Sequence, residues 1–230
     1  RRYNSHEIFN THCWSMAIAL SGCNTILSFA FLYFRIYTMN TIYDFETMSQ
    51  DPHTGAVLSF AMLNWDPKKL YTYSELVDSA AYIKFDVKEQ VEKYDRIITK
   101  ETVEWWSKQN KEAQKVIAPS KEDRSIADLY QFYWDNKPDY DGGVIYTRRN
   151  TFDPVFMTSL CHATGHADEP YKWWDIRDTI SMIDGLSYGV DIKNNFIPEG
   201  LAEHFILHDP RHDIAMDVMR MQTLIEALNA

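Results

Sequence analysis

The chain has few cysteines and fewer cationic than anionic side chains, and both shortages limit the functional classes to which it can belong. Its three cysteines are an odd number without the spacing of a disulfide framework, so we expect a protein of the reducing cytoplasm. Lysine and arginine number 23 against 33 aspartates and glutamates, which gives a formal net charge of −10. A protein that coats duplex nucleic acid needs many cationic side chains, so that class is excluded. The negative charge is compatible with an enzyme that binds a few nucleotides at a strand end, because bound metal ions supply local positive charge there.

The chain also lacks internal repeats and low-complexity tracts. Its 230 residues, 45% of them hydrophobic, suffice for one α/β domain with a core and are too few for two. Residues 1–38 carry a net charge of +2, whereas the remainder carries −12. We expect residues 39–230 to form the folded enzyme and residues 1–38 to be a leader outside it. A membrane anchor or signal, suggested by the uncharged stretch at residues 16–34, is the alternative.

Hydrophobic patterning from Met39 onward predicts strands first and then alternating helices and strands. Turn-prone segments separate three β-rich stretches, at residues 41–46, 56–63 and 70–77, which indicates an antiparallel meander. Further strands are predicted at residues 144–146 and 172–176, and helices at residues 99–106, 120–132, 153–160 and 211–228. This order predicts an α/β fold in which helices cover both faces of a mixed sheet.

Asp44 and Glu46 form a carboxylate pair within the first predicted strand. Successive side chains of a strand point to opposite faces, so the two acids lie side by side while Phe45 points away. Two like charges at this separation repel each other unless a cation lies between them. Oxygen ligands favour Mg²⁺ or Mn²⁺, and the pair therefore predicts a site for a hard metal ion.

Near the C-terminus, three histidines each precede an aspartate by five positions: His204 and Asp209, His208 and Asp213, His212 and Asp217. Pro210 favours the second pair, because proline suits the first position of a helix and the aspartate before it can act as the cap. His208 then lies on the loop that enters the helix, and Asp213 lies in its first turns. The four-residue spacing of the histidines is also compatible with a zinc site, although Pro210 interrupts the continuous helix that such a site needs.

These motifs resemble the DEDDh branch of the 3′–5′ exonucleases, which have a ribonuclease H-like fold. The resemblance rests on Asp-x-Glu at residues 44–46, Asn-x-x-Asp at residues 150–153 and His-x-x-x-x-Asp at residues 208–213. Two further segments, Glu104-Trp105-Trp106 and the stretch at residues 173–178, make the chain similar to the phage exonuclease A group. That group includes bacterial 3′–5′ exoribonucleases with the same Glu-Trp-Trp signature. The similarity spans about residues 39–230.

The resemblance implies a two-metal hydrolysis that releases nucleoside 5′-monophosphates from the 3′ end of a single strand. It implies two Mg²⁺ ions, for which Mn²⁺ can substitute, and four acids as their ligands: Asp44, Glu46, Asp153 and Asp213. His208 is the implied general base, because histidine titrates close to neutral pH. The expected substrate contacts are Phe45, Thr47, Met48, Trp106 and Asn150.

We expect single-stranded DNA as the substrate of a cytoplasmic enzyme that requires neither an obligate protein partner nor a membrane. A 3′–5′ exoribonuclease acting on short or single-stranded RNA is the nearest alternative. Recognition of RNA depends on a contact to the 2′-hydroxyl, and no residue of the sequence identifies one. A non-catalytic nucleic-acid-binding module is the third hypothesis, and the presence of all four acids and the histidine argues against it.

Overall fold

The computed structural model describes residues 39–138 and 143–229, so the predictions for residues 1–38 lie outside the described part of the chain. The described residues form a mixed sheet of five strands in the order β3-β2-β1-β4-β5. The strands are β1 (Asn40–Thr47), β2 (Val57–Trp65), β3 (Ala81–Lys84), β4 (Ile145–Thr147) and β5 (Ile176–Asp178). β1, β2 and β3 pair antiparallel, whereas β4 is parallel to β1 and β5 is parallel to β4. The predicted meander and mixed sheet are confirmed.

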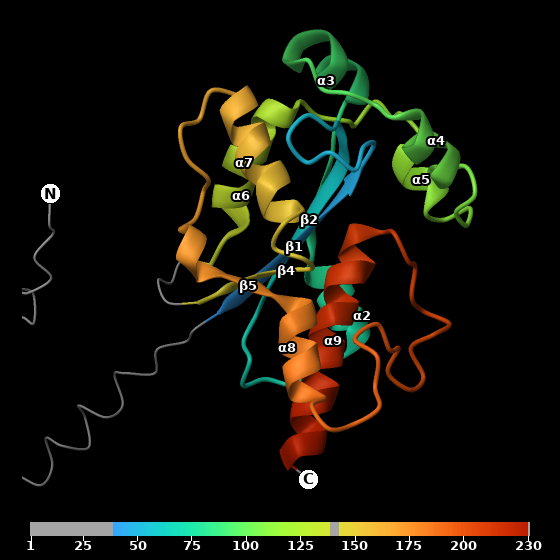
Figure 1. The fold of residues 1–230 in the computed structure, drawn as a ribbon, viewed down its shortest axis with the longest axis vertical. Helices are drawn as coiled ribbons and strands as arrows, with labels where there is room; N and C mark the ends of the chain where they lie inside the picture. Colours follow the sequence, from blue (N-terminus) through green and yellow to red (C-terminus); the bar gives the residue numbers. More distant parts are fainter. Residues whose placement is uncertain (1–38, 139–142, 230) are drawn as a thin grey trace, which may run out of the picture. The chain divides into compact units, whose positions relative to one another are not determined.

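Helices cover both faces of this sheet, as Figure 1 shows. One face packs against α6 (Leu129–Asn136) and α7 (Asp153–Ala163), and the other against α2 (Tyr73–Ser79), α8 (Thr179–Leu186) and α9 (Pro210–Asn229). Further helices follow β3 and precede α6 along the chain: α3 (Val87–Tyr94), α4 (Lys100–Trp106) and α5 (Gln114–Ile117). Among the helices of the described residues, none has the length and apolar character needed to cross a membrane.

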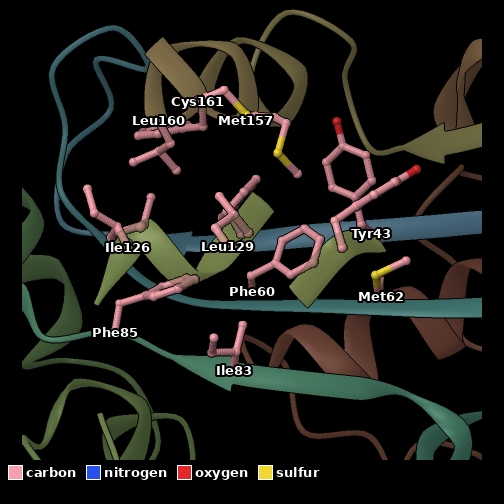
Figure 2. Close-up of a cluster of buried hydrophobic side chains, with 14 of the residues drawn as sticks. Tyr43, Phe60, Met62, Ile83, Phe85, Ile126, Leu129, Met157, Leu160 and Cys161 are labelled. Carbon is pink, nitrogen blue, oxygen red and sulfur yellow. The ribbon is translucent and has the colours of Figure 1, made fainter. Parts of the chain in front are cut away.

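β1 is the central strand, and its side chains alternate between two cores. Tyr43 and Phe45 point into the first core, where strand residues such as Phe60 meet side chains of α6 and α7 (Figure 2). Ile42 points into the second core, which β1 and β2 form with α2, α8 and α9. Because of this alternation, Asp44 lies on the same face as Ile42. The strand therefore presents its acids on the side that α9 covers.

The predicted strand at residues 70–77 is wrong, because this stretch enters α2. The hydroxyl group of Thr72 accepts a hydrogen bond from the backbone N–H of Glu75 (3.3 Å), and the Glu75 carboxylate accepts one from the backbone N–H of Thr72 (2.8 Å). This reciprocal capping box stabilises the start of a helix. It outweighs the β propensity of Tyr71, Tyr73 and Val77, which depends strongly on context.

Two other predicted elements begin later than expected. Ser120 and Asp123 close a turn, in which the backbone N–H and hydroxyl of Ser120 donate to the Asp123 carboxylate (2.9 Å each). The helical path starts only at the 3₁₀ turn η1 (Ile126–Asp128), and β5 starts only after the 3₁₀ turn η2 (Trp173–Asp175). The predictions for β1, β2, β4, α4, α7 and α9 are confirmed to within a few residues.

Candidate active site

A cleft of about 630 Å³ opens where β1, the loop after β4 and the start of α9 meet. It is lined by the four acids predicted as metal ligands and by the histidine predicted as the base: Asp44, Glu46, Asp153, Asp213 and His208. In open α/β sheets, ligands commonly bind outside the carboxyl ends of the strands, and this cleft lies at such a place. The fold therefore brings together residues from three distant segments of the chain.

Asp153 enters the cleft from the first position of α7. An acid is favoured there by the helix dipole, and Pro154 after it suits the first turn. The side chain is only 2% exposed, and its Oδ1 accepts a hydrogen bond from the backbone N–H of Phe45 (3.3 Å). This bond fastens Asp153 to β1, next to Asp44 and Glu46.

Asp213 and His208 are linked across the start of α9. The helix begins at Pro210, as the sequence predicts, and Asp213 lies in its first turn. The Asp213 carboxylate accepts a hydrogen bond from the backbone N–H of His208 (2.9 Å), and His208 has a left-handed φ of 68°. Ligand atoms of Glu46, His208 and Asp213 all lie within 4.8 Å of one another. The loop thus folds back and places the imidazole beside the acids.

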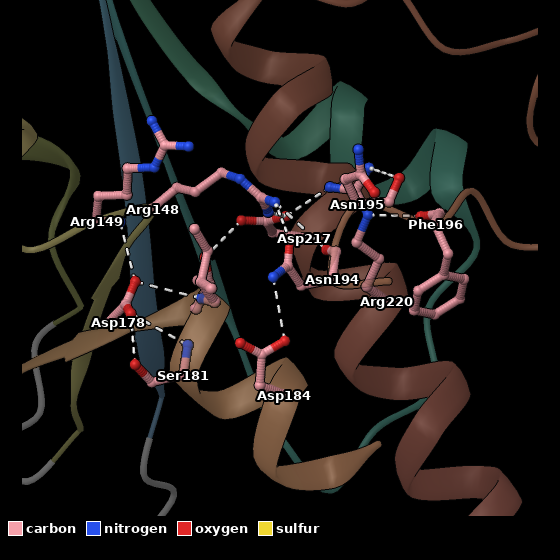
Figure 3. A network of polar contacts seen from close by, with 12 residues as sticks. Arg148, Arg149, Asp178, Ser181, Asp184, Asn194, Asn195, Phe196, Asp217 and Arg220 are labelled. Atoms are coloured by element: carbon pink, nitrogen blue, oxygen red, sulfur yellow. Dashed lines mark hydrogen bonds and ion pairs between the residues drawn. The ribbon is translucent and has the colours of Figure 1, made fainter. Parts of the chain in front are cut away.

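The competing pair of His212 and Asp217 has a structural role. His212 Nδ1 lies 2.7 Å from the Tyr73 hydroxyl. Asp217 is buried and accepts hydrogen bonds of 2.6 Å from three side chains, those of Arg148, Arg220 and Thr179 (Figure 3). His204 and His208 both precede the helix, so the alternative of three histidines in a stripe on one helix does not form, as Pro210 indicated. His208 and Asp213 are therefore the pair that joins the other acids.

Burial raises the pKa of the cleft carboxyl groups. The pKa of Asp153 rises from 3.8 to about 8 and that of Asp213 to about 7, because burial disfavours the charged form; backbone hydrogen bonds oppose both shifts. The pKa values of Asp44 and Glu46 are raised well above their ordinary values, first by burial and then by the neighbouring carboxylates. Without a cation, the cleft does not hold four negative charges at neutral pH.

This donor set fits hard divalent cations. Carboxylate oxygens are the preferred ligands of Mg²⁺ and Mn²⁺, and the charge of such an ion removes the repulsion that raises the pKa values of the acids. Within the close group of Glu46, His208 and Asp213, the two carboxylates can reach one ion, and Asp44 and Asp153 add further oxygen ligands on the same cleft wall.

The stability of the metal-free protein is expected to fall as the pH rises from about 4 to about 8. The pKa values of Asp153 and Asp213 in the folded protein exceed 3.8, so the folded state binds more protons than the unfolded state in this interval. The stabilisation is complete at the acidic end and is lost as the pH passes the raised pKa values. The midpoint of thermal unfolding in EDTA should drop by several degrees, since about 1 kcal/mol shifts Tm by about 2–4 °C at this size.

Circular dichroism melts of the wild type and Asp153→Asn check this expectation. The asparagine does not titrate, so the variant should show a smaller drop in Tm across the same interval. Mg²⁺ should raise the Tm of the wild type more at the alkaline end than at the acidic end. Equal pH dependence in the two proteins would show that Asp153 does not carry the effect.

The rings of two predicted substrate contacts, Phe45 and Trp106, are buried in the structure, although Phe45 is among the residues that line the cleft. Phe45 is 4% exposed, and its ring centroid lies 4.7 Å from that of Phe60, so the ring packs in the core. Trp106 is 1% exposed, and its indole N–H donates to the carbonyl oxygen of Thr47 (2.9 Å). Stacking on a nucleobase needs an exposed aromatic face, and neither ring offers one.

Trp105, the other tryptophan of the Glu-Trp-Trp signature, contacts His208, although it is not among the residues that line the cleft. Its ring is 41% exposed and meets the His208 imidazole edge-to-face, with centroids 4.7 Å apart. Adjacent helical residues point in different directions, so one tryptophan of the pair packs inward. The i, i+4 spacing of Thr102 and Trp106, both buried, is the sequence signal that identifies the inward one.

The other predicted contacts lie outside the cleft wall. Thr47, Met48 and Asn150 are not among the described residues that line it, whereas Thr151 and Phe152 are. Asn150 is exposed, and its side-chain oxygen accepts a hydrogen bond from a threonine hydroxyl on β4 (3.1 Å).

Comparison with known proteins places this geometry among nucleases. Residues 39–217 match the family model described as a 3′-5′ exoribonuclease Rv2179c-like domain. The chain is also 34% identical over 199 residues to an exodeoxyribonuclease of Enterobacteria phage T4. The matched region covers 79% of this chain and 86% of the relative.

Solved structures of exonuclease I share the fold. E. coli exonuclease I in complex with a dA16 oligonucleotide matches with a TM-score of 0.52 at 15% identity, and exonuclease I from Methylocaldum szegediense matches with a TM-score of 0.52 at 14% identity. Each match covers 84% of this chain. The chain spans only 43% of those exonuclease I chains, so it corresponds to one part of them.

Proposed function

This chain belongs to the family of the 3′-5′ exoribonuclease Rv2179c-like domain and is a DEDDh-type 3′–5′ exonuclease. From this membership we propose that it hydrolyses single-stranded DNA from the 3′ end. The observation that carries the proposal is the convergence of four acids and His208 in one cleft. DNA is favoured over RNA because the phage relative, similar along most of both chains, is an exodeoxyribonuclease. The family match begins at residue 39, which supports residues 39–230 as the catalytic domain.

In the proposed mechanism, Asp44, Glu46, Asp153 and Asp213 hold two Mg²⁺ ions. When bound, such ions lower the pKa of water and stabilise the charge that develops on the leaving 3′-oxygen. His208 accepts the proton of the attacking water. Burial lowers the pKa of His208 below 6.5, so its imidazole is neutral and able to accept a proton at neutral pH.

Two contacts, one of the backbone and one of the ring, hold His208 in place for this step. Its backbone N–H is fixed by Asp213, and its ring rests against Trp105. Attack of water on the terminal phosphodiester then breaks the bond to the 3′-oxygen, and a nucleoside 5′-monophosphate is released.

A 3′–5′ exoribonuclease is the second candidate, because the matching family model describes an exoribonuclease domain. Discrimination between the two sugars requires a contact to the 2′-hydroxyl. Gln50 and Thr151 line the cleft and carry groups that can donate to or accept from a hydroxyl. An RNA substrate would use such a contact, whereas a DNA substrate would not.

The experiment that tests the function compares DNA and RNA oligonucleotides of the same sequence, each labelled at the 5′ end. With Mg²⁺, we expect a ladder that shortens from the 3′ end and forms faster on DNA. EDTA should stop the shortening, because it removes the metal ions that lower the pKa of water and stabilise the leaving 3′-oxygen. Faster shortening of RNA would select the exoribonuclease, and cleavage that persists in EDTA would refute the metal-dependent mechanism.

A further inference from the structure

The wall of the acidic cleft contains one arginine whose charge is not compensated. Arg148 and Arg220 also line the cleft, but both donate to the buried Asp217. Arg149 is exposed, and among the described residues no carboxylate lies within ion-pair distance of its guanidinium. Figure 3 shows this guanidinium directed away from Asp178, whereas that of Arg148 reaches toward Asp217. A free positive charge therefore stands beside the catalytic carboxylates.

The backbone of Arg149 is held in an uncommon conformation. Its φ of 71° lies in the left-handed region, which few residues other than glycine adopt. Its N–H donates to the Asp178 carboxylate (2.9 Å), and its carbonyl oxygen accepts from the N–H of Phe152 (3.1 Å). Asp178 is itself fixed as the N-cap of α8, where it accepts from the N–H groups of Ile180 and Ser181 (3.3 and 3.1 Å). Such strained positions persist only where the surroundings determine them, and they cluster at functional sites.

We propose that Arg149 binds a backbone phosphate of the single-stranded substrate upstream of the scissile bond, and that Asp178 is the positioning residue that holds Arg149 at the cleft. This inference rests on the proposed exonuclease function. Cleft carboxylates repel the phosphates of an entering strand, and a guanidinium offsets this repulsion through charged hydrogen bonds to phosphate oxygens. Arg149 is joined to Asp153 by one short turn, so a phosphate held there keeps the strand in register with the acids.

Arg149→Gly isolates the side chain, because glycine adopts positive φ without strain. We expect the variant to bind a 5′-fluorescein oligothymidylate about 10-fold or more weakly, the scale of a hydrogen bond to a charged group. The slope of log affinity against log salt should fall by about 0.7, the value for one phosphate contact on a single strand. Binding is measured by fluorescence anisotropy with Ca²⁺ in place of Mg²⁺. Arg124→Ala, which removes an exposed arginine paired with Asp128, is the matched control and should bind like the wild type.

Oligonucleotides that each carry one neutral methylphosphonate linkage locate the contact. The wild type should lose affinity at one linkage near the 3′ end, and Arg149→Gly should be insensitive at that linkage. Wild-type affinity and salt slope in Arg149→Gly, or the same linkage sensitivity as the wild type, would overturn the proposal. Hydrolysis of the unmodified oligonucleotide by the wild type is scored separately, so a failure of the proposed function is distinguishable from a failure of this inference.

A double-mutant cycle tests the role of Asp178. Asp178→Ala should weaken binding in the wild-type background and have no further effect in Arg149→Gly, because the two residues act through one contact. Asp178→Asn keeps a carbonyl acceptor and a good helix cap, so it should bind nearly as the wild type does. An undiminished effect of Asp178→Ala in the Arg149→Gly background would show that Asp178 does not act through Arg149. Circular dichroism verifies the folding of each variant. If the alanine variant does not fold, Asp178→Ser, which keeps a helix cap but shortens the side chain that accepts from Arg149, takes its place in the cycle with the same expected result.

Discussion

Asp44→Asn is expected to slow hydrolysis by at least about 10³-fold and, at the same time, to raise the melting temperature of the metal-free protein. A metal ion contributes several kcal/mol of transition-state stabilisation, and each 1.4 kcal/mol corresponds to a factor of ten in rate. The gain in stability has an electrostatic origin. The pKa of Asp44 is raised by burial and then by the charges of Asp153, Glu46 and Asp213, and a neutral asparagine removes both costs.

Asp86→Asn is the matched control for this substitution. Asp86 caps α3, where its carboxylate accepts a hydrogen bond from the backbone N–H of Glu89 (3.0 Å), and asparagine caps a helix about equally well. The control should keep wild-type activity and stability. Single-turnover rates in saturating Mg²⁺ and melts in EDTA provide the two measurements. Activity of Asp44→Asn within tenfold of the wild type would remove Asp44 from the proposed ligands, and a lowered Tm would contradict the electrostatic explanation.

His208→Ala is expected to reduce the turnover rate by about 10²-fold or more, the scale of a lost general base. His212→Ala should leave the rate close to that of the wild type, because His212 bonds to Tyr73 and is not among the residues that line the cleft. Loss of that bond should cost about 1 kcal/mol of unfolding free energy. The two substitutions remove the same side chain four positions apart, so each is the control for the other.

The pH dependence of turnover gives a second readout for His208. Its pKa lies below 6.5, so the wild-type rate should decline only on the acidic side, where the imidazole becomes protonated and no longer accepts a proton. At Mg²⁺ concentrations that saturate the carboxylates across the pH range, His208→Ala should lose this acidic decline. A severe defect in His212→Ala together with a nearly normal His208→Ala would assign the base to the other histidine and refute the proposed mechanism.

Local patterns were sufficient to predict the strands and helices that carry the acids. Alternation along β1 placed Asp44 and Glu46 on one face, and Pro210 fixed the start of α9 and with it the position of Asp213. These signals act within a few residues of the chain. They are therefore readable without knowledge of the tertiary structure.

Features that depend on distant residues were not predictable in this way. Asp217 accepts a hydrogen bond from Arg148, which lies 69 positions away in the sequence, and the residues next to either one do not predict this pair. Trp105 and Trp106 are adjacent and both rings lie near His208, but only the packing of α4 decides which of them is buried and which keeps an exposed face. The wrong strand at residues 70–77 has a different cause, because the reciprocal cap of Thr72 and Glu75 that starts α2 is a local signal, which the β propensity of the neighbouring residues masks.

The alternation of side chains along β1, with Asp44 and Glu46 on one face and Tyr43 and Phe45 on the other, constrains how this enzyme can diverge. A shift by one position along a strand moves every side chain to the other face. An insertion or deletion of a single codon within β1 would thus drive the acids toward α6 and α7 and expose Tyr43 and Phe45 to the nucleic acid. Length changes among relatives should therefore accumulate in connections away from the cleft, such as residues 66–72 between β2 and α2, while the number of residues in β1 stays the same.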